Sequence, residues 1–227
     1  MFHTCRSSPL ELVLATEIGD SITAAHFMEA TQARKRAMNA ILWNEEMGQW
    51  LDYWLNDRTT CKEDGYTWET SNQNRNVFAS NFVPLWIELF NSGNVAVGIT
   101  EDGTLVEKVT QSFQSSGLLQ AAGIATSITN SGQQWDFPNG WAPLQHLIVE
   151  GLVRSGSKEA RSLAEDIAIR WIRANYVAYK KSGAMHEKYD TEKCGEFGGG
   201  GEYNPQDLAG LMELYWHSWR SSDGLKT

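Results

Sequence analysis

The amino-acid sequence predicts an all-α domain built from paired helices. Segments near residues 21–41, 105–113 and 157–178 carry apolar residues three and four positions apart, the spacing of helices with one buried face. No run of alternating β-branched residues flanked by hairpin turns occurs between them. Loops therefore alternate with helices along the chain, an arrangement typical of all-α domains.

The first predicted helix begins after Asp20 or Ser21 as the N-cap. Its buried face is expected to consist of the apolar residues at helical spacing, which are Ile22, Ala25, Met28, Ala33, Ala37, Ala40 and Ile41. An aromatic-rich segment follows at 43–54, where Gly48 is predicted to break the helical pattern. We expect about half of this segment to lie in the core.

Two further helices are predicted before the middle of the chain. Residues 78–87 are expected to begin a helix that is buried on both faces, with Pro84 tolerated only in its first turn. Residues 105–113 form the next helix, and Gly117 is a candidate for its end.

The C-terminal half contains the strongest helical pattern. After a helix near 144–152, Ser157 is predicted to cap a long helix that ends at Gly183. The buried stripe of this helix consists of Leu163, Ala164, Ile167, Trp171, Ala174 and Ala178.

Composition excludes several classes of function. The 227 residues are 41% apolar and 21% charged, which is ordinary for one large globular domain. The net charge is −9 and no Lys/Arg block occurs, so nucleic acid and anionic membranes are disfavoured as partners and neutral substrates fit better. The three cysteines indicate neither a disulfide framework nor a metal site, and no membrane span or convincing signal peptide is predicted.

Residues 133–143 combine two indoles, a carboxylate, an amide and two prolines in a segment without helical or strand periodicity. Indoles stack on the C–H face of a pyranose, while Asp136 and Asn139 can hydrogen-bond its hydroxyl groups. The segment is therefore predicted to be a sugar subsite on a loop. The alternative is a buried Trp-rich turn before a helix, and the residues alone leave both open.

A second unusual stretch contains four consecutive glycines, 198–201, followed by Glu202. Such a run is a flexible linker, a lid, or a place where backbone approaches a ligand closely. A lid is the preferred interpretation because Glu202 and Tyr203 follow rather than more Gly and Ser. Phosphate binding is disfavoured because the run has no Gly-Lys-Ser/Thr ending.

These two stretches resemble motifs of the trehalase family. Residues 134–143, Gln-Trp-Asp-Phe-Pro-Asn-Gly-Trp-Ala-Pro, are similar to the second trehalase motif, and 187–190 with 198–203 resemble the family's C-terminal catalytic loop. The resemblance extends from about residue 12 to residue 206, and the sequence of residues 126–135 is most similar to that of plant members of the family. It implies the C-terminal part of an (α/α)6 barrel of the six-hairpin glycosidase type. It also implies hydrolysis of α,α-trehalose to glucose with inversion and without a cofactor.

The resemblance also implies roles for individual residues. Glu187 corresponds to the general base that activates water, and Glu202 to a substrate-binding carboxylate. The glucose subsites would be lined by Trp135, Asp136, Asn139 and Trp141. A solvated loop acid at Glu187 and a core position for Trp141 are the alternatives, and His186 is interpreted as a structural neighbour.

Two features depart from the family pattern. The family's general acid is an Asp in a Ser-Gly-Trp-Asp context, whereas the single Trp-Asp here, at 135–136, belongs to the second motif, so the chain is expected to lack the acid. It would then be at most a sugar-binding or interaction remnant unless the acid is supplied. After residue 206 the family reads Gly-Phe-Gly-Trp-Ser-Asn-Gly, which codons for residues 207–213 also encode in another frame. Residues 1–206 are therefore predicted to be the trehalase part and 207–227 an out-of-frame tail.

Overall fold

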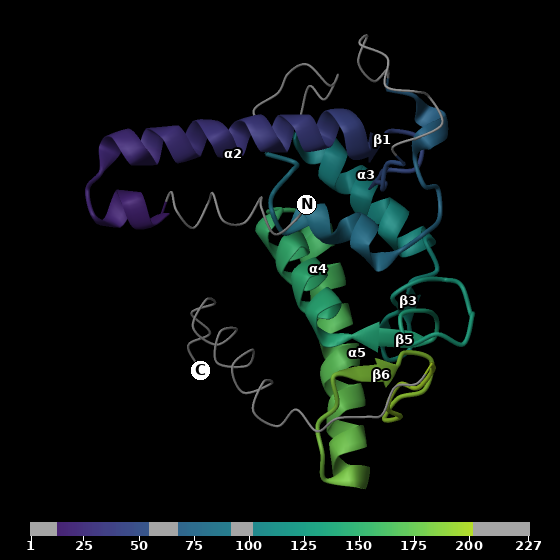
Figure 1. Ribbon diagram of the computed structural model, residues 1–227. Coiled ribbons are helices and arrows are strands. Elements are labelled where there is room, and N and C mark those ends of the chain that lie inside the picture. The colour runs from purple at the N-terminus through teal and green to yellow at the C-terminus, as the bar shows by residue number, and fades with distance from the viewer. Residues whose placement is uncertain (1–12, 55–67, 92–101, 202–227) are drawn as a thin grey trace.

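The computed structural model describes residues 13–54, 68–91 and 102–201 (Figure 1). Its helices include α2 (Ser21–Leu42), α3 (Asp102–Ser115), α4 (Ala142–Arg154) and α5 (Lys158–Ser182), with 3-10 helices η1 (Thr70–Asn72) and η2 (Ala79–Leu85). Helices α4 and α5 pack side by side, and α2 lies across one end of the pair. Of the helices that the structure describes, none is both long enough and apolar enough to cross a membrane.

Helix boundaries follow the predicted capping residues. The carboxylate of Asp20 accepts a hydrogen bond from the Thr23 amide at 3.0 Å, at the start of α2. The hydroxyl of Ser157 accepts one from the Ala160 amide at 3.4 Å, at the start of α5. Gly183 ends α5 with φ of 73°, a conformation that glycine adopts without strain. These three predictions are confirmed.

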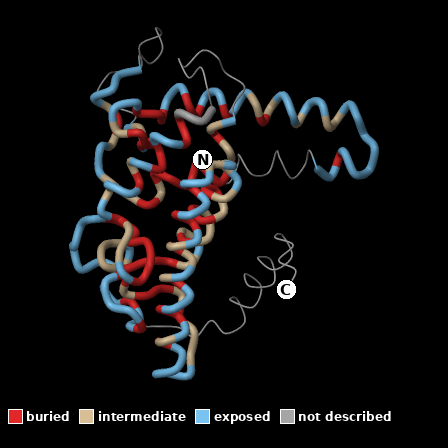
Figure 2. Tube along the Cα trace, turned by 180° about the vertical axis from the view of Figure 1, so that it is seen from behind, coloured by how far each residue is buried: buried red, intermediate tan, exposed pale blue. Residues whose placement is uncertain are grey.

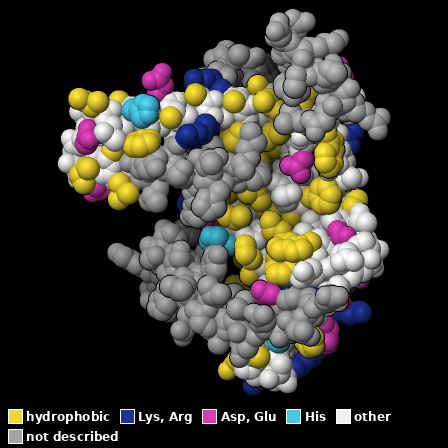
Figure 3. All heavy atoms as spheres, in the orientation of Figure 1, with side chains coloured by type: hydrophobic (Ala, Val, Ile, Leu, Met, Phe, Trp, Pro, Cys, Tyr) yellow, Lys and Arg dark blue, Asp and Glu magenta, His cyan; other side chains and the backbone are white. Residues whose placement is uncertain are grey.

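The predicted buried face of α2 is wrong. Ile22 is 83% exposed and Met28 is also exposed, and Figure 3 shows hydrophobic side chains at the projecting end of α2. The stripe that is buried is mostly polar, and consists of Thr31, Lys35, Met38, Asn39 and Leu42. Its polar groups meet backbone carbonyls of the segment after η2: the Lys35 ammonium donates to Glu88 O and the Asn39 amide to Leu89 O. Because buried carbonyls require donors, this polar stripe is the one that faces the protein.

The segment at 78–87 also differs from its prediction. It forms the 3-10 helix η2, with Pro84 near its end rather than in the first turn of an α-helix. The predicted burial on both faces is confirmed, because residues 81–85 are all buried. The main core lies where η2, α3, α4 and α5 meet, and Figure 2 shows buried positions concentrated there rather than along α2.

Within the described residues, six short strands form three antiparallel pairs, which the sequence did not predict. Strand β1 (Trp43–Asn44) pairs with β2 (Gln49–Trp50), and β3 (Leu119–Gln120) pairs with β4 (Gly123–Ile124). Strand β5 (Asn139–Trp141) pairs with β6 (Lys188–Asp190). No strand in the described part exceeds three residues, so the all-α prediction is confirmed. The short strand pairs connect loop segments to each other by backbone hydrogen bonds.

Candidate active site

The pairing of β5 with β6 joins the two motifs that lie far apart in the sequence. Trp141 lies opposite Lys188, and Gly140 lies opposite the fully buried Tyr189. One residue beyond this register, the Ala142 amide donates to the carbonyl oxygen of Glu187 at 3.3 Å. The predicted base therefore lies at the first turn of α4, beside the end of the predicted sugar loop.

The two indoles of the loop stack on each other. The rings of Trp135 and Trp141 are nearly parallel, at 8° with centroids 3.9 Å apart. Trp141 is only 7% exposed and its indole N–H donates to Gln134 O at 3.1 Å, whereas Trp135 is 53% exposed. Trp141 thus supports Trp135 from within the protein, and Trp135 is the indole available to a ligand.

The side chain of Asp136 holds the loop together through hydrogen bonds. One carboxylate oxygen accepts a hydrogen bond from the Ser127 hydroxyl at 2.8 Å, and the other accepts one from the Ser131 hydroxyl. The backbone adds to this, since the Asp136 amide donates to Gln133 O and its carbonyl accepts from the Asn139 amide. Both carboxylate oxygens are thereby used to hold the loop in one conformation.

Asn139 is buried beneath the same loop, with 3% of its surface exposed. Its side-chain amide donates to the carbonyl oxygens of Asp136 and, more distantly, Gln133. Its side-chain oxygen has no hydrogen-bond partner, and it lies against Gly198, where an added Cβ would be 2.4 Å away. A sugar contact from Asn139 stays a prediction, while its contacts to the loop and to Gly198 are observed.

The surroundings of Glu187 are set by its neighbours. Its side chain is half-buried, and the negative charge acts on the adjacent Lys188. His186 is buried, packs against the rings of Tyr189 and Phe197, and has no hydrogen-bond partner at Nδ1. This placement agrees with a structural position for His186. Glu202, the other predicted carboxylate, lies outside the described residues.

Lys188 is the residue that sequence analysis missed. It is fully buried, which is rare for lysine, and its ammonium lies over the Trp141 ring, 5.4 Å from the centroid. Burial lowers the pKa of Lys188, and the negative charge of Glu187 acts in the opposite direction. Its position between Glu187 and Tyr189 in the catalytic-loop motif was the signal that could have identified it.

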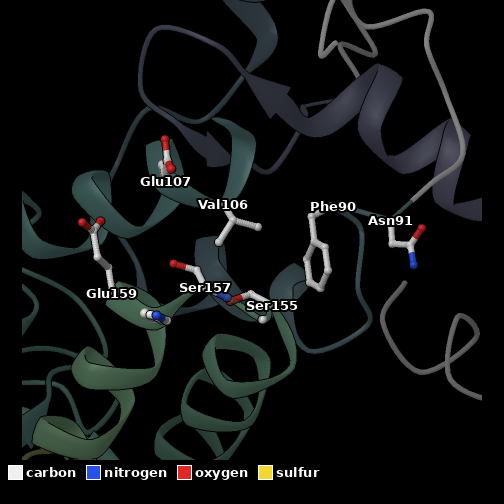
Figure 4. A pocket seen from close by; sticks show the side chains of 9 residues that line it. Phe90, Asn91, Val106, Glu107, Ser155, Ser157 and Glu159 are labelled. Carbon is white, nitrogen blue, oxygen red and sulfur yellow. The ribbon is translucent and has the colours of Figure 1, made fainter. Parts of the chain in front are cut away.

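A pocket of about 550 Å³ opens at the other end of α4 (Figure 4). It lies between Phe90 and Asn91 after η2, Val106 and Glu107 of α3, and residues 155–159 of the turn into α5. Of the predicted site residues that the structure describes, none lines it. The candidate site is therefore the stacked loop and β6, not this pocket.

Comparisons with known proteins identify the family of this chain. The family model described as Trehalase matches residues 8–210. A probable trehalase from Oryza sativa subsp. japonica is 60% identical over 189 residues, covering 83% of this chain and 33% of the relative. The trehalase from Arabidopsis thaliana is 54% identical over 209 residues, covering 88% of this chain and 32% of the relative. The chain thus spans about a third of the length of these curated relatives.

A solved structure shows the fold. Neutral trehalase Nth1 from Saccharomyces cerevisiae superposes with a TM-score of 0.55 at 24% identity, over 75% of this chain and 27% of that one. The described helices accordingly form part of an (α/α)6 glycosidase fold, as the resemblance implied. Since the family model covers most of the chain and plant relatives exceed half identity, the chain belongs to the trehalase family of glycoside hydrolases.

Proposed function

We propose that this chain contributes the water-activating part of a trehalase active site, which hydrolyses α,α-trehalose to two glucose molecules with inversion. The observation that carries the proposal is the β5–β6 pairing, which brings the backbone of Glu187 next to Ala142, the residue that follows the stacked indole of Trp141. The two motifs lie nearly fifty residues apart in the sequence. A flexible linker or a solvated loop acid at Glu187 would not require them to be in contact. Their contact supports one site made of both.

Sugar binding in this proposal depends on Trp135. One face of its ring is covered by Trp141, and the ring remains half exposed, so it offers a flat apolar surface to a pyranose ring. The loop beneath it is held by the serine hydroxyls on Asp136, so little ordering is required when the sugar binds. Asp136, Asn139 and Glu202 remain proposed substrate contacts.

The chemistry assigned to Glu187 is general-base catalysis. Its carboxylate takes a proton from water while the water oxygen bonds to the anomeric carbon, on the face opposite the leaving group. The glycosidic C–O bond breaks, and a general acid gives its proton to the oxygen of the leaving glucose. Inversion requires the two carboxyl groups to lie about 6.5–9.5 Å apart, with the water between the base and the sugar.

The general acid is not assigned to any residue of this chain. The Ser-Gly-Trp-Asp pattern does not occur in the 227 residues. Asp136 is a poor substitute because a general acid must donate a proton, whereas both oxygens of Asp136 accept hydrogen bonds from serine hydroxyls. This observation favours a second candidate function, sugar binding without turnover, for the chain acting alone.

The test measures trehalose binding calorimetrically and glucose release enzymatically with the purified chain. We expect binding that Trp135→Ala abolishes and Trp54→Ala leaves unchanged, since Trp54 is an exposed indole outside the loop. Glucose release is expected only when the acid is supplied by further trehalase sequence. Turnover comparable with an intact trehalase would contradict the missing acid, and a folded chain that binds no trehalose would contradict the sugar loop.

A further inference from the structure

The glycine segment, defined as residues 198–201, lies against the sugar loop. The Gly201 amide donates to Gly132 O at 3.0 Å, and an added Cβ at Gly200 would lie 2.8 Å from the same oxygen. At the other end the Gly198 amide donates to Lys188 O at 3.1 Å. The segment therefore contacts both the loop and β6, which is the close backbone approach that glycine allows.

The side chain of Lys188 adds a third attachment between these contacts. Its ammonium donates a hydrogen bond to Gly199 O while lying over the Trp141 ring. A hydrogen bond from a charged donor to a carbonyl is stronger than one from a neutral donor. The aliphatic part of Lys188 packs against Gly198, where an added Cβ would lie 3.0 Å from Cγ.

We propose that Lys188 is a positioning residue that holds the glycine segment against the start of the loop that carries the stacked Trp135–Trp141 pair. Lys188 links three parts of the site. It directly follows the proposed base Glu187, its ammonium covers the ring of Trp141, and its hydrogen bond to Gly199 O holds the glycine segment. This inference rests on the proposed function only in assigning the loop to sugar binding.

The attachment itself is measured without sugar, by hydrogen–deuterium exchange of the Gly198 and Gly201 amides in the whole chain. In Lys188→Met, which keeps the length and apolar part of the side chain, exchange at both amides should rise about tenfold or more, the loss expected for one charged hydrogen bond. Lys188→Arg, which keeps the charge, should return exchange toward the wild-type rate. Amides of Ile167 and Ala174 in the core of α5 should not change.

A uniform rise across α5 as well would mean that Lys188 supports the fold in general, and would overturn the proposal. If Lys188→Met does not fold, Lys188→Gln is measured in its place. Wild-type exchange at Gly198 and Gly201 in either folded variant also overturns it. Failure of the wild-type chain to bind trehalose would instead contradict the proposed function and leave the exchange result unaffected.

Discussion

Gly140 is the position at which one added methyl group should separate the two halves of the site. It occupies the middle of β5, opposite Tyr189 of β6. A Cβ built there would lie 2.5 Å from the carbonyl oxygen of Ile124 and 2.5 Å from Cγ2 of Thr191. The Ile124 oxygen is backbone, so rotating a side chain cannot relieve both contacts.

The magnitude follows from what must move. Restoring an ordinary contact of about 3.5 Å requires β5 to shift by roughly 1 Å. The Ile124 carbonyl also accepts a hydrogen bond from the Gln145 side chain at 2.6 Å, and the same side chain accepts from the Ile124 amide. Overpacking costs about 1–3 kcal/mol and a weakened buried hydrogen bond about 1 kcal/mol, so Gly140→Ala should destabilise the chain by about 2–4 kcal/mol.

Urea unfolding followed by circular dichroism measures this loss as a lower midpoint at an unchanged slope. Gly199→Ala is the matched control, because a Cβ at Gly199 meets nothing within 4 Å and should leave the midpoint unchanged. Trehalose binding should weaken in Gly140→Ala for the same reason, since the loop and Glu187 lose their common support. A free energy of unfolding within about 0.5 kcal/mol of wild type would refute the steric argument.

Three further outcomes are expected. Hydrogen bonding to His146 is the largest cause that lowers the pKa of Glu150 to about 2. The ionised Glu150 therefore stabilises the fold by about 1–2 kcal/mol after solvent screening, and this contribution is complete above pH 4.5 and lost as pH falls from there toward 2. Urea midpoints measured across this range should fall less in Glu150→Gln than in the wild type. In an active trehalase carrying this sequence, Glu187→Gln should lower kcat by about 10²–10⁴-fold with little change in KM and Asp136→Asn should lower it less, and equal losses of kcat would show the base to be misassigned. Ile167→Ala in the core of α5 should lower the free energy of unfolding by about 2–5 kcal/mol while Ile172→Ala on its exposed side stays within about 0.5, and similar losses in thermal melts would contradict the burial difference.

Helix ends could be predicted from sequence because they depend on chemistry within a few residues. Asp20, Ser157 and Gly183 each satisfy or terminate a helix through contacts within four positions, so no knowledge of the fold was needed. The buried face of α2 depends instead on its partner. Apolar spacing favoured Ile22 and Met28, but the segment after η2 presents carbonyl groups, and these select the polar stripe with Lys35 and Asn39.

The sequence indicated a set of candidate site residues but not their arrangement. The sequences of the two motifs indicated Trp135, Trp141 and Glu187 individually. The pairing of β5 with β6 covers three residues in each strand, which is too few to give a periodic pattern in the sequence. The stacking of one indole on the other could not be predicted either, because both are tryptophans in one aperiodic segment and nothing in the sequence distinguishes the buried one from the exposed one. Only the fold shows that Trp141 is support and Trp135 is surface.

Helix α5 shows the same limit at the level of the whole fold. The predicted stripe is buried, with Ile167 in the main core and Trp171 against Tyr189 of β6. Ile169, Ile172 and Tyr176 nevertheless form a second apolar stripe that is exposed. An amphipathic helix at the surface needs one apolar face, while a helix between two layers needs two. In an (α/α)6 fold each helix contacts both its hairpin partner and a neighbouring helix, so helices with two apolar stripes are typical of this fold. Periodicity within α5 alone could not show which of its two stripes the described residues bury.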